Sequence, residues 1–350
     1  MRKNSGENTD MEKNMVRGQR NHAVDLMKGI AIILVLITHF EWSGDERHFF
    51  IFPYVVNMAV PIFMIITGYV YSNSIKRRNI DSFEEEWSLI LFMRRVIRYT
   101  IPFLIVVLWE LLDSKKIKPE EPVDMVKWII NGAGGPGSFY YPVMMQMIIV
   151  IPAIHVLVKK YKLHGLVMTF LLNLLYEILA WSYVLPYGSY RLICLRYIFL
   201  VSVGVYSYYD GNISFKQGFA VTLIGAAFIW MITYYGYTPI ILDNGWETTN
   251  CICGLVVAPT MIWYLQNVKA EFAPLELIGK ASYNIFFVQM VYYSCYDIFI
   301  MERFSSWKVQ LPLSMIICIT IGILFYIIET PITSFVIEKT EKVLNRFYLV

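Results

Sequence analysis

The chain has 350 residues, of which 57% are hydrophobic and only 16% charged, and its mean hydropathy is +0.51. Because a soluble domain carries about 25% charged residues, this composition excludes an ordinary soluble protein and indicates one unit embedded in a membrane. The net charge of +3 is small, so the positions of the charges carry more information than their sum. We expect no nucleic-acid partner.

Ten apolar segments are candidates for helices that cross a bilayer, which requires about 20 mostly apolar residues each. In chain order they are residues 23–41, 51–72, 88–112, 139–158, 164–184, 190–209, 216–236, 250–266, 281–300 and 311–336. We expect the eighth segment to bend at Pro259. The chain begins with polar residues, so we expect no cleavable signal peptide and a first helix that stays in the protein.

The sequence therefore predicts an all-α fold, a polytopic membrane helix bundle of about ten transmembrane helices. We expect a cytoplasmic N-terminal tail over residues 1–22, a transmembrane domain over 23–337 and a cytoplasmic C-terminal tail over 338–350. The orientation follows from Lys and Arg near the helix ends, which favour the cytoplasmic side. With the N-terminus inside, twenty-one of them lie on the cytoplasmic side and eight on the other.

The five cysteines all lie in or beside apolar segments: Cys194, Cys251, Cys253, Cys295 and Cys318. None belongs to a Cys/His pattern with the spacing of metal ligands. We interpret them as small apolar side chains and expect no metal site.

The first apolar segment contains KGIAIILVLITHFEW, with His39 near its outer end. Ionisable residues inside membrane helices are costly, so they are candidates for a functional role. The position of His39 alone also fits a second interpretation, an interfacial histidine that bonds a backbone carbonyl. Asp25 lies on nearly the same helix face but about 21 Å away, so it cannot orient His39 directly. We expect a structural or charge-pairing role for Asp25.

The stretch FMRRVIRYTIP places Arg95 and Arg98 on one face, at the cytoplasmic start of the third segment. Two interpretations are open. The pair anchors the helix at the membrane surface, or it clamps phosphate groups, whose oxygens match the guanidinium fork.

A Gly- and Pro-rich stretch, NGAGGPGSFYYPVMMQ, leads into the fourth segment, and Ser138 is expected to cap that helix. Irregular backbone at membrane depth is tolerated where it is buried in protein or lines a cavity. The stretch is therefore either part of a site or a plain connecting loop. Glu110, Arg196 and Glu329 are also within helices, and we expect a structural role or pairing with other buried charges; the sequence does not show which pairs form.

Seven motifs resemble, in order, those of the acyltransferase-3 family of bacterial multi-pass membrane acyltransferases. They are RNHAVDLMKGIAIILVLITH, NMAVPIFMIITGYVYS, RRVIRYTIPFL, GPGSFYYPVMMQMIIVIP, RYIFLVSVGVY, IGKASYNIFFVQM and IIETP. Their shared order and spacing over about residues 20–337 argue against coincidence. One position departs from the pattern, because this chain has Gln289 where many members have histidine.

The resemblance implies an integral-membrane acyltransferase that moves an acyl group, most often acetyl, from cytoplasmic acyl-CoA to a hydroxyl of a carbohydrate or glycan. The acceptor would lie at the outer side of a bacterial cell membrane. His39 would be the general base, and Arg95 and Arg98 would bind the donor. Acyl-CoA would be a co-substrate, with no permanently bound cofactor. We expect the acceptor side to be lined by Tyr69, Tyr140, Gln146 and Tyr283.

Two other classes of function remain open from the residues alone. A multi-pass transporter of a small polar or anionic solute would also use intramembrane Arg, Glu and His, although we find no inverted repeat. A membrane protein with only a structural or assembly role would need no catalytic residues. The sequence does not determine the acyl group, the acceptor, a covalent intermediate, the oligomeric state or a partner protein that completes the transfer.

Overall fold

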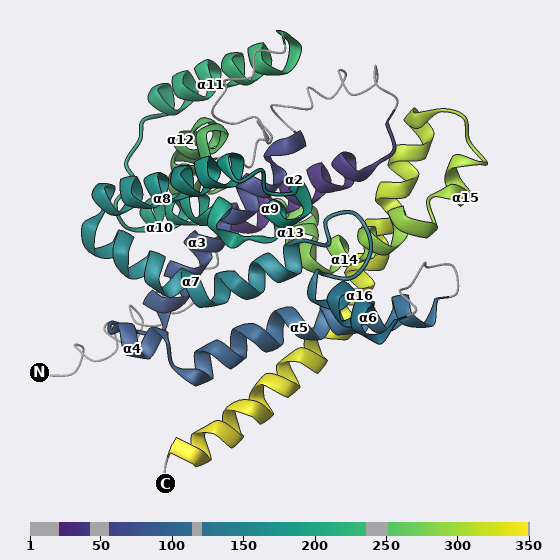
Figure 1. Cartoon of the computed structure of the whole chain (residues 1–350), viewed down its shortest axis with the longest axis horizontal. Coiled ribbons are helices and arrows are strands. Elements are labelled where there is room, and N and C mark those ends of the chain that lie inside the picture. Colours follow the sequence, from purple (N-terminus) through teal and green to yellow (C-terminus); the bar gives the residue numbers. More distant parts are fainter. Residues whose placement is uncertain (1–20, 43–55, 114–120, 236–250, 349–350) are drawn as a thin grey trace, which may run out of the picture.

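The computed structural model describes residues 21–42, 56–113, 121–235 and 251–348, and within these ranges the regular secondary structure is entirely helical (Figure 1). This confirms the predicted all-α class. Most of the predicted N-terminal tail lies outside the described residues.

The longer helices are α2 (His22–His39), α3 (Ala59–Arg77), α5 (Leu89–Leu112), α7 (Tyr140–Tyr161), α8 (Leu163–Ser182), α10 (Ile198–Tyr209), α11 (Phe215–Tyr235), α12 (Cys251–Asn267), α14 (Ser282–Cys295) and α16 (Trp307–Tyr348). Shorter elements join them: η2 (Val56–Met58), α4 (Phe83–Glu86), α6 (Pro122–Ile130), α9 (Tyr187–Leu192), η3 (Cys194–Tyr197), α13 (Ala273–Lys280) and α15 (Ile298–Met301).

Several of these helices are long and apolar enough to cross a membrane. In the described part of the chain five meet this condition by length and composition: α2, η2 with α3, α7, α8 and α16. Each of the ten predicted segments overlaps a helix in the described part of the chain, although several include non-helical residues. Helix α12 contains Pro259, and the bend expected there stays a prediction. The number of ten spans stays a prediction.

The sixth predicted segment, residues 190–209, is not one continuous helix. Helix α9 ends at Leu192, Ile193 takes an extended conformation, and the 3-10 turn η3 precedes α10, which has only 12 residues. Twelve helical residues extend over about 18 Å, less than the hydrocarbon core of a bilayer. The prediction of a full-length helix here was wrong.

Side chains from neighbouring helices stabilise this break. The Gln146 amide on α7 donates to the carbonyl of Leu192 (2.6 Å) and accepts from the backbone N–H of Cys194 (3.1 Å). The side-chain amide of Asn173 on α8 donates to the backbone carbonyls of Arg196 (3.0 Å) and Leu195 (3.3 Å). Backbone groups freed inside a membrane protein need such partners, so the break depends on residues about 20 to 50 positions away in the chain.

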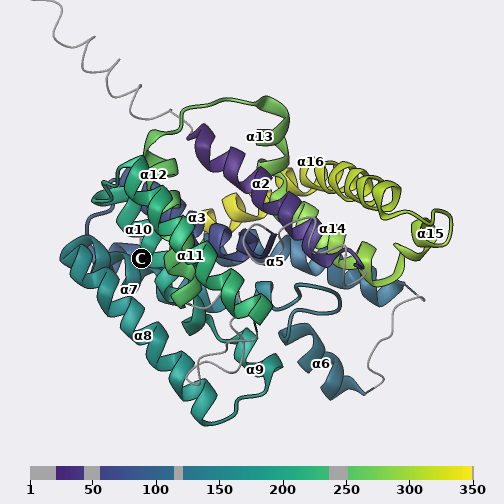
Figure 2. The same ribbon diagram turned by 90° about the horizontal axis from the view of Figure 1, so that it is seen from above.

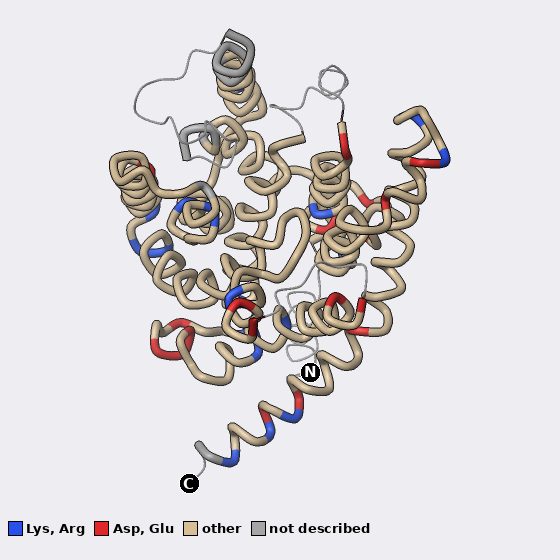
Figure 3. Tube along the Cα trace, turned by 45° about the vertical axis from the view of Figure 1, so that its right-hand side comes forward, with Lys and Arg blue, Asp and Glu red and all other residues tan. Residues whose placement is uncertain are grey.

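Helix α16 is longer than predicted. It continues through Pro331 into residues 338–348, which we had assigned to a C-terminal tail. Figure 3 shows that these last turns carry charges of both signs. Arg94 on α5 pairs with Glu341 there, with 2.8 Å between Nε and Oε1. The C-terminal residues up to Tyr348 are therefore an extension of the bundle's last helix.

The two largest apolar clusters among the described residues hold the bundle together, and α2 contributes to both. One joins α2 to α3, α7, α10 and α12, and the other joins it to α5, α14 and α16. Figure 2 shows α2 in the middle of the bundle, with α13 beside it. Helices α3 and α10 approach closely through Gly68 and Gly204, where a methyl group would fall within 2 Å of the backbone oxygen of Val201 or Ile65.

Candidate active site

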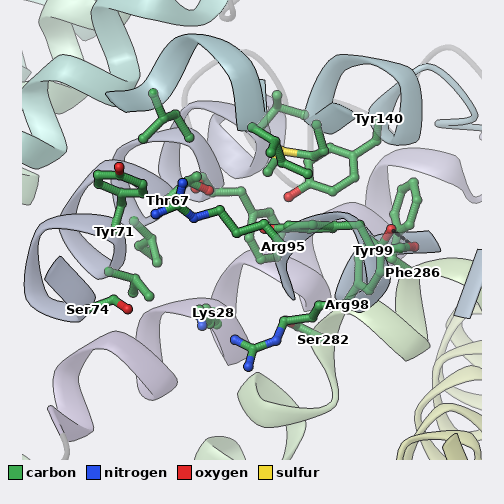
Figure 4. A pocket seen from close by; sticks show the side chains of 18 of the residues that line it. Lys28, Thr67, Tyr71, Ser74, Arg95, Arg98, Tyr99, Tyr140, Ser282 and Phe286 are labelled. Atoms are coloured by element: carbon green, nitrogen blue, oxygen red, sulfur yellow. Dashed lines mark hydrogen bonds between the residues drawn. The ribbon is translucent and has the colours of Figure 1, made fainter. Parts of the chain in front are cut away.

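A cavity of about 270 Å³ lies between α2, α3, α5, α7 and α14 (Figure 4). Five cationic side chains line it: Lys28, Arg78, Arg94, Arg95 and Arg98. They come from the N-terminal halves of α2 and α5 and from the end of α3. His39 lines the same cavity at the other end of α2, about 16 Å along the helix from Lys28. One cavity thus joins the two groups of residues that the sequence had singled out separately.

Arg95 and Arg98 both extend into this cavity (Figure 4). The Arg95 guanidinium lies over the ring of Tyr71, 4.5 Å from its centroid, and donates to the backbone carbonyl of Glu86 (3.4 Å). Arg98 is exposed to the cavity, on the same side as Lys28 and Ser282 in this view. Arg95 is therefore held in place by its neighbours, whereas Arg98 is more accessible to a ligand.

A buried hydrogen-bond network centred on Glu86 holds the groups that contact Arg95. The carboxylate of Glu86 is 2.8 Å from Nδ1 of His155 and accepts from the Tyr71 hydroxyl (3.0 Å). The other ring nitrogen of His155 lies 2.9 Å from the hydroxyl of Tyr209. Glu86 and His155 are almost completely buried, so this network fixes the short helix α4 and the Tyr71 ring on which Arg95 rests.

The cationic residues repel one another in the absence of a ligand. Burial, together with the nearby charges of Arg94, Arg98 and Arg95, lowers the pKa of Arg78, while Glu341 opposes this effect. A cluster of guanidinium groups with few acids attracts a polyanion, and phosphate oxygens match the guanidinium fork. This end of the cavity is thus suited to a ligand with phosphate groups.

At the opposite end, His39 is oriented by Gln289 on α14. His39 Nδ1 is 2.9 Å from Oε1 of Gln289, and Nε2 of Gln289 donates to the backbone carbonyl of Pro136 (3.0 Å). The residue at which the chain departs from the family's pattern is therefore the direct partner of His39. The structure agrees that Asp25 cannot orient His39, because the two lie at opposite ends of α2.

The Gly-rich stretch before α7 forms the wall beside His39. Gly137 has a positive φ of 89°, and a methyl group there would lie 2.8 Å from the Phe286 ring and 3.3 Å from Cε1 of His39. Glu110 is fully buried and accepts from the backbone N–H of Gly134 (3.2 Å). Ser138 is not the helix cap we expected, because it lies inside this turn and Phe139 directly precedes α7.

Two of the four expected acceptor-side residues line the cavity. Tyr140 and Tyr283 do so, and the Tyr283 hydroxyl donates to the backbone carbonyl of Tyr99 (3.1 Å). Tyr69 is not among the lining residues, and its hydroxyl accepts from Asn21 (2.9 Å). Gln146 is also outside the lining, since its amide serves the break before α10.

The three residues expected in structural or charge-pairing roles are all buried: Asp25, Arg196 and Glu329. Arg196 lies in η3 at the break, with its guanidinium over the rings of Tyr190 (4.3 Å) and Tyr197 (5.0 Å). Glu329 accepts from Asn284 (3.2 Å) and from Thr333. Within the described residues, no group of three or more His, Cys, Asp and Glu could hold a metal ion.

Sequence reasoning missed part of the cationic end. Lys28, Arg78 and Arg94 line the cavity, but we had counted them only as evidence for orientation. A positive residue near a helix end serves both purposes, so composition alone cannot separate them. The spacing of Arg94, Arg95 and Arg98 on α5 was the available signal, because it places three guanidinium groups within two turns.

The chain belongs to the acyltransferase family defined by the model described as "Acyltransferase domain", which matches residues 21–328. The match confirms the resemblance drawn from the seven motifs. Together with the apolar helices, it identifies a membrane acyltransferase. Searches of curated proteins and of solved structures give no match.

Proposed function

We propose that this membrane acyltransferase uses cytoplasmic acyl-CoA, acetyl-CoA above all, to acylate a hydroxyl of a carbohydrate or glycan at the outer side of the membrane. The observation that supports this most is that one cavity has five cationic side chains at one end and His39 at the other. Such a cavity suits a long, thin donor that is anionic at one end and reactive at the other.

Arg95 and Arg98 bind the donor's phosphates in this proposal, and Lys28, Arg78 and Arg94 add to the attraction. The donor's arm then extends between α2, α3 and α7 along apolar side chains such as Phe63, Met144 and Ile148. This holds the thioester near His39. Fixing two reactants in one geometry is itself a large contribution to catalysis.

His39 acts as the general base on the acceptor hydroxyl, since an imidazole exchanges protons readily near neutral pH. Tyr140 and Tyr283 are close enough to the same cavity to contact the acceptor. The chain spans a bacterial cell membrane ten times, with both termini cytoplasmic. The donor then enters at the cationic end and the acceptor approaches from the His39 end.

The test is acyl transfer by purified protein in detergent, with labelled acetyl-CoA and a panel of sugar acceptors. We expect the parent to release CoA and form an ester. His39→Gln should lower turnover by about 10²–10⁴-fold, the usual contribution of general acid–base catalysis, with donor affinity retained. Turnover by His39→Gln at the parental rate would contradict the role of His39.

The same protein in sealed vesicles separates the proposal from the transporter alternative. Movement of an intact anion across the vesicle membrane, without ester formation for any acceptor or acyl-CoA tested, would favour a transporter. Ester formation with no net movement of CoA across the membrane would support the acyltransferase.

A further inference from the structure

Gln289 connects two parts of the cavity wall through one amide group. Its side chain is fully buried on α14. The nitrogen Nε2 lies 3.0 Å from the carbonyl oxygen of Pro136, and the oxygen Oε1 lies 2.9 Å from Nδ1 of His39.

The backbone carbonyl of Pro136 determines how the amide is oriented. A carbonyl oxygen can only accept, so the NH₂ of Gln289 must face it. A reversed amide would place two oxygens against each other. The Gln289 oxygen therefore faces His39, and because this oxygen can only accept, Nδ1 of His39 must carry the proton.

We propose that Gln289 is a positioning residue that holds neutral His39 in the tautomer protonated at Nδ1, which leaves Nε2 as the nitrogen that takes the acceptor's proton. This rests on the proposed role of His39 as general base. His39 lines the cavity, and within the described residues no hydrogen bond occupies its Nε2.

The proton balance of the transfer follows from this assignment. Nε2 takes the proton as the hydroxyl oxygen bonds to the thioester carbonyl carbon. The carbon–sulfur bond then breaks, and Nε2 returns the proton to the departing sulfur, so that CoA leaves as a thiol. While the imidazole is positive, its Nδ1–H bond to Gln289 is charge-assisted and stronger.

An amide suits this position because it accepts a hydrogen bond but does not titrate. The proton therefore stays on the imidazole and is available to the leaving sulfur. The same amide bonds the carbonyl of Pro136, which precedes Gly137. A methyl group added at Gly137 would lie 3.3 Å from Cε1 of His39, so this backbone is close to the ring. One side chain thus fixes both the ring and the wall that the ring faces.

The tautomer can be measured directly by nitrogen NMR of histidine-labelled protein in detergent, above neutral pH and without substrates. The chain has five histidines, and the difference from a His39→Gln spectrum assigns the signal. We expect His39 to be protonated at Nδ1, whereas free imidazole side chains in water favour protonation at Nε2. A parent His39 protonated at Nε2, or at both nitrogens, would overturn the proposal.

Two variants separate orientation of the ring from support of the loop. Gln289→Leu removes both hydrogen bonds, and His39 should then lose its Nδ1–H signature. Gln289→Glu keeps an oxygen that accepts from Nδ1 but loses the donor to Pro136, so the signature should persist. If Gln289 only supports the loop, both variants should leave the signature unchanged. Should neither variant fold, the parent's tautomer alone decides.

Gln146→Leu is the matched control, because Gln146 also bridges two backbone groups but has no contact with His39. It should leave the His39 signal as in the parent. In transfer assays Gln289→Leu should lower kcat about ten- to a hundredfold, by analogy with the loss of a partner that orients a metal-binding histidine, with little change in KM for acyl-CoA. A parent with the expected tautomer that transfers no acyl group would contradict the proposed function and not this assignment.

Discussion

At the scale of single residues, the cationic end of the cavity combines held and accessible guanidinium groups. Arg95 rests on Tyr71 and bonds the backbone of Glu86, and Arg94 pairs with Glu341, whereas Arg98 is exposed to the cavity. Charged groups that are already bonded contribute less to a new ligand. We therefore expect Arg98 to contribute more to donor binding than Arg94.

Replacing the two predicted donor-binding residues should weaken acyl-CoA binding. Each of Arg95→Ala and Arg98→Ala removes a charge-assisted hydrogen bond to phosphate, on the order of 1.5–3 kcal/mol, so KM for the donor should rise about ten- to a hundredfold. Lys at either position should restore part of this, since it keeps the charge but loses the fork. Exposed Arg77 does not line the cavity and supplies the control variant Arg77→Ala. Unchanged donor affinity in the double Ala variant would leave both residues as membrane anchors.

Gly137 should be sensitive to even one methyl group. Its φ of 89° disfavours any L side chain, and the added carbon would press on Phe286 and on His39. We expect Gly137→Ala to lower turnover at least tenfold, measured with saturating donor. The control is Gly188→Ala, because an added carbon there meets nothing within 4 Å. Equal activities of the two variants would show that the wall beside His39 tolerates displacement.

How far the sequence predicts these residues depends on what each one contacts. His39, Arg95 and Arg98 were found because motif and position coincide. Gln289 was noticed only as a departure from the family's pattern. Its contact with His39 spans 250 positions of the chain, so it leaves no local sequence pattern. Tyr69 and Gln146 fell outside the cavity lining because a polar residue in a membrane helix equally serves other helices.

At the scale of helices, hydropathy located the elements well but not their breaks. The apolar run over 190–209 looks continuous, yet the chain leaves the helix at Ile193, where the side chains of Gln146 and Asn173 supply partners for the freed backbone groups. Propensity alone does not reveal this, because the bonding groups lie on other helices. Similarly, α16 extends past its apolar part, supported by the Arg94–Glu341 pair.

The break before α10 gives a testable consequence for stability. Gln146→Leu would leave the carbonyl of Leu192 and the N–H of Cys194 without this partner, at about 1–3 kcal/mol for each buried group. We expect a clearly lower midpoint of thermal unfolding in detergent. Gln217→Leu also removes hydrogen bonds, but at an exposed site where water replaces them. A Gln146→Leu midpoint no lower than that of Gln217→Leu would mean that the break is supported by other contacts.

At the scale of the whole molecule, the cavity gives the bundle a direction. Its cationic end is on the side where α2 and α5 begin and α3 ends, and its His39 end is on the opposite side. The Lys and Arg residues at the cationic end are among those from which the sequence predicts a cytoplasmic side, and this orientation stays a prediction. The number of membrane-spanning helices does not follow from helix length, because short helices such as α10 and α14 do not satisfy a simple length rule.

Reporter fusions test the orientation of the bundle. A fusion after Asn345 should report a cytoplasmic position, and a fusion near Glu121 should report an outer position. This follows because positive residues favour the cytoplasmic side. A fusion at Asn79, which follows α3, is the internal control and should agree with the first. Reporters at Asn345 and Glu121 that agree would contradict ten spans with both termini inside.

The cationic end of the cavity, which would bind the donor, lies apart from His39, where the acyl group would be transferred, and this has a kinetic consequence. If acyl-CoA is the donor, as proposed, its phosphates remain on CoA after the acyl group has left, so the product keeps nearly all the contacts of the substrate. Free CoA should therefore inhibit competitively against the donor, with an inhibition constant near the donor's KM. Its departure would then be a slow step beside ester formation, and added salt would speed the release of CoA by weakening the retained charge contacts.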